Sequence, residues 1–183
     1  MEASDISYSV FQDWRANRGN IKSQIVLALF RLATLIRSNK ILIILFFWYL
    51  LFYRFFVEWV LGIELPWSLK AGRGLKLDHG QALVINGEAR LGRNVHVRHS
   101  TTIGSKQLAT GDHSACPRIG NNVDIGANVC IIGDIDIGDN VKIGVGSIVV
   151  KSIPSNCVVV GNPARVIKEN THISQPVTSS EPR

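Results

Sequence analysis

An aliphatic residue occupies every sixth position between Pro117 and Val150. The series runs Ile119, Ile125, Ile131, Ile137, Ile143 and Val149. An α-helix repeats about every 3.6 residues and a strand about every 2, so a sustained period of six indicates a larger structural repeat. Three places after these positions stand residue types that tolerate positive φ, namely Asn122, Asn128, Asp134, Asn140 and Gly146. Each unit of six therefore predicts one short strand and one tight corner.

Three such units close a triangle, which predicts a parallel β-helix whose aliphatic side chains stack inward as an apolar column. Upstream the pattern continues at Ala71, Leu77 and Leu83 and, after two extra residues, at Leu91, Val97 and Ile103, with Gly74, Gly80 and Asn94 at corners. The step from Ile103 to Ile119 is ten residues longer than one unit. We therefore expect twelve units in four coils, with an extruded loop over 105–117.

The composition changes sharply near residues 62 to 70. Every aromatic residue lies at or before Trp67, whereas fourteen of the sixteen glycines lie after Lys70. We therefore expect an apolar helical segment at 1–67, a β-helix domain at 68–154 and a C-terminal cap at 155–170. The polar tail at 171–183 is expected to be disordered.

The first segment carries two helical signals. Residues Ile21 to Arg37 have apolar positions at helical spacing, which predicts one amphipathic helix. The following uncharged run from Ile41 to Tyr53 is thirteen residues long and ends at Arg54 and Glu58, which could pair at i, i+4. A membrane span needs about 20 apolar residues. Three interpretations stay open: a span, an interfacial helix touching a membrane through residues 41–61, or a helix buried against other protein.

Charge and cysteine content narrow the function classes. The net charge of +6 is scattered, and no aromatic residue follows Trp67, so a stacking platform for nucleic acid is not expected. An anionic small ligand or a membrane surface stays open. Cys116, Cys130 and Cys157 lack CxxC spacing, so free thiols, no structural zinc and a reducing compartment are expected. The mixed, acidic N-terminus does not resemble a signal peptide, which favours a cytoplasmic protein.

The histidines are the candidates for chemistry on a wall that is otherwise a scaffold. His79 follows Asp78 in "LDHG", and Glu64 lies fifteen residues upstream, close to one coil. A carboxylate beside an imidazole fixes its tautomer, as a general base for a hydroxyl requires, although a solvated wall histidine can also be merely polar. His96 and His99 should point to opposite faces without a third ligand, so no metal site is expected. His113 lies in the extruded loop, where it could reach a site.

Four stretches resemble a known family: "YRFFVEWVLGIELP", "GRGLKLDHGQALVINGEARLGRNV", "IGNNVDIGANVCIIGDIDIGDNVKIGVGSIVVKSIP" and "VVVGNPARVIK". They are similar to the hexapeptide-repeat acyltransferases, which fold as a left-handed parallel β-helix, and within them to serine O-acetyltransferases and the exopolysaccharide branch. The resemblance implies that His79 is the general base, that Glu64 orients it and that Asp78 holds the acceptor. It also implies a homotrimer with acetyl-CoA as co-substrate, bound in a groove between neighbouring β-helices. The implied lining is Ser105, Gly126, Ala127, Gly144 and Val145, with Lys142 as a phosphate contact.

The acceptor is where the sequence departs from serine acetyltransferases. Their Arg-His pair before the proline that re-enters the coil is replaced by Ala115 and Cys116 before Pro117, and their "GGTGK" loop is replaced by "GSKQLATGD". An amino-acid carboxylate needs a cationic partner, so this loss favours a sugar hydroxyl of an exopolysaccharide or capsule precursor, free or lipid-linked. Two alternatives stay open: a serine O-acetyltransferase, and a non-catalytic trimeric β-helix scaffold.

Overall fold

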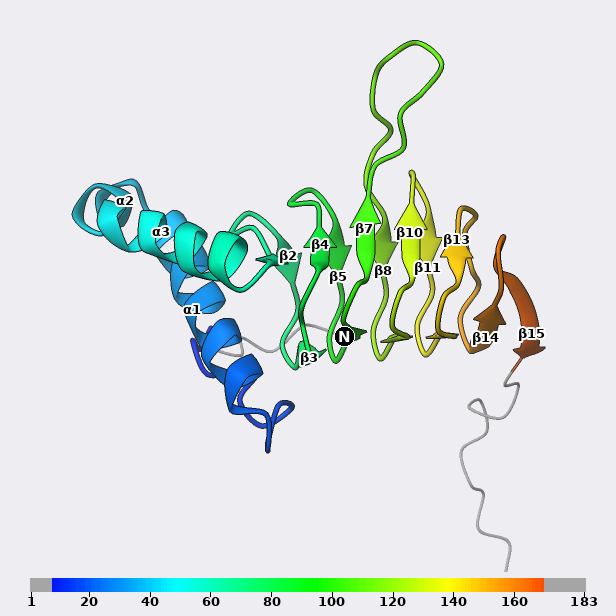
Figure 1. The fold of residues 1–183 in the computed structure, drawn as a ribbon, viewed down its shortest axis with the longest axis horizontal. Helices are drawn as coiled ribbons and strands as arrows, with labels where there is room; N and C mark the ends of the chain where they lie inside the picture. The colour runs from blue at the N-terminus through cyan, green and yellow to red at the C-terminus, as the bar shows by residue number, and fades with distance from the viewer. Residues whose placement is uncertain (1–7, 170–183) are drawn as a thin grey trace, which may run out of the picture.

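The computed structural model describes residues 8–169 and confirms a mainly β chain folded as a parallel β-helix (Figure 1). Within these residues the strands form three sheets. The five-stranded sheet contains β1 (Ile63–Glu64), β4 (Leu83–Ile85), β7 (Thr102–Gly104), β10 (Cys130–Ile132) and β13 (Ile148–Val149). The four-stranded sheet contains β2 (Lys70–Ala71), β5 (Arg90–Leu91), β8 (Arg118–Ile119) and β11 (Asp136–Ile137). The six-stranded sheet contains β3 (Lys76–Asp78), β6 (His96–Arg98), β9 (Asp124–Ile125), β12 (Lys142–Ile143), β14 (Cys157–Val160) and β15 (Arg165–Glu169).

The period of six has the predicted structural cause. The aliphatic side chains from Ile119 to Val149 are at most 4% exposed and form the inner column of the prism. Asn122, Asn128 and Asn140 adopt φ near 55–57° at the corners, as their position in the repeat predicts. One corner differs from the prediction, because Gly133 (φ 106°) takes the left-handed position in place of Asp134. A glycine adopts this backbone conformation without steric cost, so Asp134 does not need a positive φ.

The coils extend beyond the expected boundaries. β1 pairs in parallel with β4, so the first coil begins at Ile63 and not at 68. β14 pairs in parallel with β12, so Cys157 to Val160 continue the wall inside the segment expected to be a cap. The solenoid has about five turns where four were expected, because short strands without the full repeat pattern still stack on their neighbours. The residues between β7 and β8 rise from the wall as the predicted extruded loop (Figure 1), and the tail at 171–183 lies outside the described residues.

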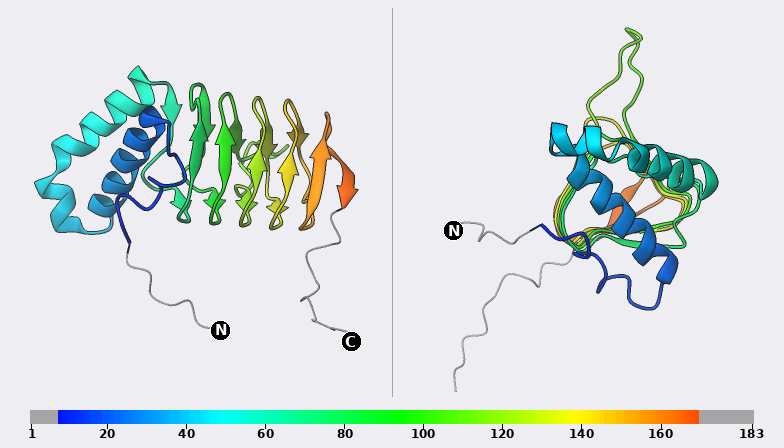
Figure 2. Two further views of the ribbon diagram at one scale, coloured as in Figure 1. Left: turned by 90° about the horizontal axis from the view of Figure 1, so that it is seen from below. Right: turned by 90° about the vertical axis from the view of Figure 1, so that its left-hand side faces the viewer.

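The predicted amphipathic helix is α1 (Ile21–Arg37), and it crosses the open end of the first coil (Figure 2). Ser23 Oγ donates to the carbonyl of Leu77 at 2.8 Å, and Asn17 Nδ2 donates to the carbonyl of Leu75 at 2.8 Å. An open sheet edge exposes unpaired backbone groups that favour aggregation. The N-terminal segment therefore closes the edge that the first coil would otherwise expose.

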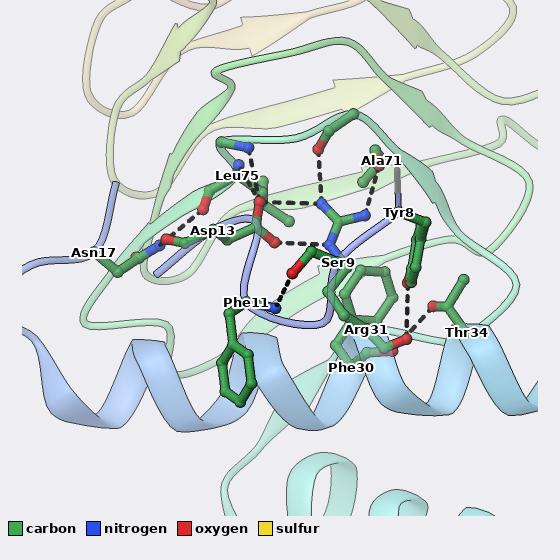
Figure 3. Close-up of polar contacts among 12 residues, drawn as sticks. Tyr8, Ser9, Phe11, Asp13, Asn17, Phe30, Arg31, Thr34, Ala71 and Leu75 are labelled. Atoms are coloured by element: carbon green, nitrogen blue, oxygen red, sulfur yellow. Dashed lines mark hydrogen bonds and ion pairs between the residues drawn. The ribbon is translucent and has the colours of Figure 1, made fainter. Parts of the chain in front are cut away.

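A buried ion pair completes this closure (Figure 3). Arg31 Nε lies 2.7 Å from Asp13 Oδ2, and both side chains are 2% exposed. Arg31 also donates to the carbonyls of Ala71 and Gly72 at 2.6 Å, while Asp13 accepts from the amide of Gly74 at 2.7 Å. Buried charges are tolerated when they are paired and fully hydrogen-bonded. Here the pair binds β2 and the following corner to the helical segment.

The apolar run forms a bent helical hairpin arm: α2 (Lys40–Leu45), α3 (Phe47–Tyr53) and the π-helix η1 (Arg54–Val60). Only Leu50, Tyr53 and Val57 of this arm are buried. Its other face is exposed and apolar, with Trp48 at 79% and Trp59 at 74% exposure. Among residues 8–169 no helix is long and apolar enough to cross a membrane.

Candidate active site

One edge of the prism carries the predicted base together with part of the predicted coenzyme A lining. The corner between the six-stranded and five-stranded sheets holds His79, His99, Ala127 and Val145 at equivalent positions in successive coils. We call this column the histidine edge. Its coils are bonded to one another, because the amide of Gly146 donates to the carbonyl of Ala127 at 2.9 Å. The fold therefore aligns residues up to 66 positions apart (145 − 79) along one line.

His79 lies at the most distorted corner of this edge. His79, Gly80 and Ala82 all have positive φ, at 63°, 37° and 51°. Positive φ is uncommon for residues other than glycine, and such strain gathers at functional sites. The imidazole of His79 is exposed and meets the ring of His99 edge-on, with centroids 5.9 Å apart. The predicted base is thus accessible and has a second histidine beside it.

His99 is a site residue that the sequence reasoning missed. Its Nδ1 is buried and has no hydrogen-bond partner among the described residues. The usable signal was its position two residues after Val97, which matches the position of His79 after Leu77 in the preceding coil. His96, three residues earlier, lies on β6 and bonds to Asp78, whereas His99 lies beyond the strand at the corner, so the expected alternation of faces does not apply to this pair.

Glu64 lies on the strand beside the His79 corner. A Cβ placed on Gly80 would lie 3.3 Å from Ile63 Cδ1, so the chain after His79 passes directly against β1. Glu64 follows Ile63 and points outward from the wall. Within residues 8–169 no hydrogen bond or ion pair joins Glu64 to His79. The structure places β1 against the turn that follows His79, and the orienting role of Glu64 stays a prediction.

Asp78 takes part in a network on the outer face of the six-stranded sheet. Its Oδ2 lies 2.5 Å from His96 Nε2 and 3.6 Å from Lys76 Nζ. On the other side of this ring, His96 Nδ1 lies 3.3 Å from Asp124 Oδ1, which Arg98 also contacts at 2.6 Å. Burial raises the pKa of Asp78, but the hydrogen bond and charge of His96 outweigh it and leave that pKa lowered. Burial lowers the pKa of His96, and the bond to Asp78 only partly offsets this effect.

The residues predicted to line a coenzyme A groove divide into two places. Gly126 and Ala127 lie one coil before Gly144 and Val145 on the histidine edge, whereas Ser105 lies at the base of the extruded loop, 3.4 Å from His113 Nδ1. Lys142 is exposed on β12, ahead of the same corner.

The two glycines have a structural reason of their own. A Cβ on Gly126 would lie 2.7 Å from the backbone nitrogen of Val145, and a Cβ on Gly144 would lie 2.6 Å from Val160 Cγ1. Both positions need glycine because the coils stack closely. The absence of a side chain therefore does not by itself open a slot for a ligand.

Among residues 8–169 no group of three or more His, Cys, Asp or Glu side chains could hold a metal ion. The chemistry that this edge supports is proton transfer by an accessible imidazole.

Comparison with known proteins identifies the family to which this chain belongs. No protein-family model matches the chain. It is 42% identical over 117 residues to a protein of Escherichia coli strain K12 named as the colanic acid biosynthesis acetyltransferase WcaB, covering 64% of this chain and 70% of that relative. The chain belongs to the hexapeptide-repeat acetyltransferase family.

Other proteins similar to this acetyltransferase are named as serine acetyltransferases. Serine acetyltransferase 2 of Arabidopsis thaliana is 40% identical over 109 residues, which cover 60% of this chain and 33% of that protein. The solved serine acetyltransferase of Brucella abortus strain S19 in complex with coenzyme A superposes with a TM-score of 0.70 at 29% identity, over 87% of this chain and 66% of that one. A soybean serine acetyltransferase apoenzyme gives a TM-score of 0.72 at 29% identity, over 86% and 67%.

Proposed function

We propose that this acetyltransferase transfers the acetyl group of acetyl-CoA to a hydroxyl of a sugar in an exopolysaccharide or capsule precursor. The observation that carries the proposal is the histidine edge, which aligns the accessible His79 with the corners of Ala127 and Val145. A thioester bound along that edge would present its carbonyl carbon to an acceptor hydroxyl beside His79. Coenzyme A bound to the Brucella relative supports acetyl-CoA as the donor.

The reaction is a direct transfer. The imidazole of His79 takes the hydroxyl proton as the acceptor oxygen attacks the thioester carbon, and the carbon–sulfur bond then breaks. The departing thiolate receives the proton from His79, so the enzyme returns to its starting state. Glu64 stabilises the imidazolium that forms in between, and Asp78 helps to hold the acceptor. No covalent acyl-enzyme is formed, and the three cysteines take no part.

The groove for coenzyme A is proposed to lie between the β-helices of a homotrimer. Gly126, Ala127, Gly144 and Val145 would line it from one protomer, with Lys142 placed to meet a phosphate. Ser105 lies on a different edge, so it would contact the cofactor of a neighbouring protomer's groove. Sedimentation equilibrium should give three times the mass of the 20.2 kDa chain.

The loop before β8 supports a sugar as the acceptor. Ala115 and Cys116 occupy the two places before Pro117, and neither can neutralise the carboxylate of an amino acid. The likeness to WcaB over 70% of its length supports the exopolysaccharide branch. The likeness to serine acetyltransferase 2 makes L-serine the competing acceptor.

Thiol release from acetyl-CoA tests the proposal. The purified protein is assayed with L-serine, with UDP-glucose, UDP-galactose and UDP-N-acetylglucosamine, and with extracted lipid-linked oligosaccharides in separate reactions. Release that depends on a sugar acceptor is expected. Release with L-serine alone would make the protein a serine O-acetyltransferase, and no release with any acceptor would leave a β-helix scaffold.

We also propose that the hairpin arm of α2, α3 and η1 docks on an anionic membrane surface, where lipid-linked acceptors are presented. Residues 13–64 contain seven basic residues and three acidic ones, Asp13, Glu58 and Glu64, and so carry a net charge of +4 (7 − 3). Glu58 is paired with Arg54, while Arg37 and Lys40 are exposed beside the apolar face. An apolar face with tryptophans and a basic rim matches an anionic lipid surface.

Vesicle flotation tests this docking. The protein should float with vesicles of phosphatidylglycerol and phosphatidylethanolamine but much less with phosphatidylcholine vesicles. Trp48→Ser combined with Trp59→Ser should remove flotation, whereas Leu108→Ser in the extruded loop should not. Assembly beyond a trimer without lipid, reversed by the tryptophan variants, would identify a second copy of this chain as the occupant and overturn the proposal.

A further inference from the structure

The longer units of the repeat have their extra residues at the edge between the five-stranded and four-stranded sheets. One unit is six residues from Ile131 to Ile137, but eight from Ile63 to Ala71 and eight from Leu83 to Leu91. The extra residues protrude at Pro66–Ser68 and Asn86–Glu88, in the two coils next to η1. The period of six cannot accommodate them inside the wall, so they build a surface feature there.

This feature is a pocket of about 360 Å³. Small-ligand sites generally range from about 300 to 1,000 Å³, so this one suits a single small ring. Its lining comes from η1, β1 and both protruding corners: Arg54, Glu58, Glu64, Pro66, Trp67, Ile85, Asn86 and Gly87. Glu64, the carboxylate beside the His79 corner, is thus also a wall of the pocket.

The pocket has an unusual pairing of groups. Arg54 Nε lies 3.3 Å from Glu58 Oε2, and the two side chains are 60% and 14% exposed. Burial raises the pKa of Glu58, and the nearby carboxylate of Glu64 raises it further, while Arg54 opposes both. Glu58 and Glu64 both line the pocket with Arg54, so its wall presents two carboxylates and one guanidinium.

We infer that this pocket binds a sugar ring of the acceptor, with Arg54 and Glu58 hydrogen-bonding to ring hydroxyls and Glu64 as a further wall of the pocket. The inference rests on the proposed function and names the acceptor subsite. Hydroxyl groups both donate and accept, so they satisfy a guanidinium and a carboxylate together. Trp67 adds an aromatic surface for the apolar face of a ring.

The charge balance of the pocket favours a sugar over an amino acid. Arg54 is already neutralised by Glu58, and Glu64 leaves the lining with one net negative charge. A ligand carboxylate would be repelled there, whereas uncharged hydroxyls would not. Specificity for the acceptor is therefore assigned to η1 and the protruding corners, and not to the extruded loop alone.

The test compares Arg54→Ala, Arg54→Lys and Glu58→Gln with the control Arg93→Ala, an exposed arginine on another edge. Hydrogen bonds to charged groups contribute about 1.5–3 kcal/mol, so the acceptor KM should rise about 10- to 100-fold in Arg54→Ala and Glu58→Gln. Arg54→Lys keeps the charge but loses the planar donor, so its KM should lie between. The KM for acetyl-CoA should stay unchanged, and Arg93→Ala should keep the parental KM for both substrates.

The outcomes separate the inference from the proposed function. If no sugar supports thiol release, the proposed function fails first. If UDP-sugars or lipid-linked oligosaccharides support release but all three variants keep the parental acceptor KM, only the pocket inference fails. A raised KM for L-serine in these variants would assign the pocket to an amino acid and overturn the inference.

Discussion

Two edges of the same β-helix have corners in the left-handed backbone conformation, but the side chains at these corners make different contacts. The edge between the four-stranded and six-stranded sheets stacks Asn94, Asn122, Asn140 and Asn156, whose side-chain amides bond to one another at 2.9–3.1 Å. We call it the asparagine edge. The histidine edge has no such ladder among its described residues, and the Nδ1 of His99 has no partner. Where side chains satisfy one another, an edge is structural; where they are left unpaired, it is available for chemistry.

The largest effect expected on the histidine edge is that of His79→Ala. Removing a general base costs about 10²- to 10⁴-fold in rate, so thiol release with the sugar acceptor should nearly cease. The ring of His79 is exposed and is not part of the apolar core. Substitutions at such surface positions rarely change stability by more than about 0.5 kcal/mol, so the melting temperature should stay within a degree or two of that of the parent. Arg93→Ala, an exposed residue on another edge, is the control. Full activity in a folded His79→Ala variant would remove the proposed mechanism.

Glu64→Gln should have a smaller effect on the same rate. The substitution keeps the shape but removes the charge that stabilises the imidazolium, worth about 1.5–3 kcal/mol for a bond to a charged group. That corresponds to a loss of about 10- to 100-fold in kcat. Initial rates at saturating acetyl-CoA measure it. A loss equal to that of His79→Ala would mean that the two residues act as one unit, whereas an unchanged rate would contradict the orienting role.

A pair of glycine substitutions separates the two edges by stability. Asn122→Gly and Asn128→Gly both place glycine at φ near 55°, so neither is strained. Asn122 loses its bonds to Asn94 and Asn140 and should cost about 1–2 kcal/mol, whereas Asn128 makes no side-chain hydrogen bond within residues 8–169 and should change stability by less than about 0.5 kcal/mol. Urea unfolding measures both. Equal losses would mean that the asparagine ladder contributes nothing.

The sequence predicted the coils and the extruded loop, but it did not predict where the first coil begins. The spacing of Ile119 and its successors is enough for the coils, because one rule repeats along the chain. α1 was predictable to the residue from its amphipathic pattern. The start at Ile63 was not, because β1 has two residues and little pattern of its own.

The candidate site divides in the same way. His79 and Glu64 were readable because they lie about one coil apart, whereas the pocket with Arg54 and Glu58 depends on how η1 meets two coils. Such a contact has no period that a sequence could display.

His99→Ala gives the smallest effect and the sharpest comparison with the asparagine edge. Edge-on aromatic pairs are worth about 0.5–1.5 kcal/mol, so losing the ring that meets His79 should lower kcat about 2- to 10-fold with little change in KM. His99→Phe keeps the ring and should restore the rate, because the role assigned to His99 is to position its neighbour. If His99→Phe is as slow as His99→Ala, the unpartnered Nδ1 and not the ring is what matters, and His99 then contacts the substrate. In either case the activity of the histidine edge would depend on His99, whose Nδ1 has no partner. The side chains of the asparagine edge, in contrast, are hydrogen-bonded to one another.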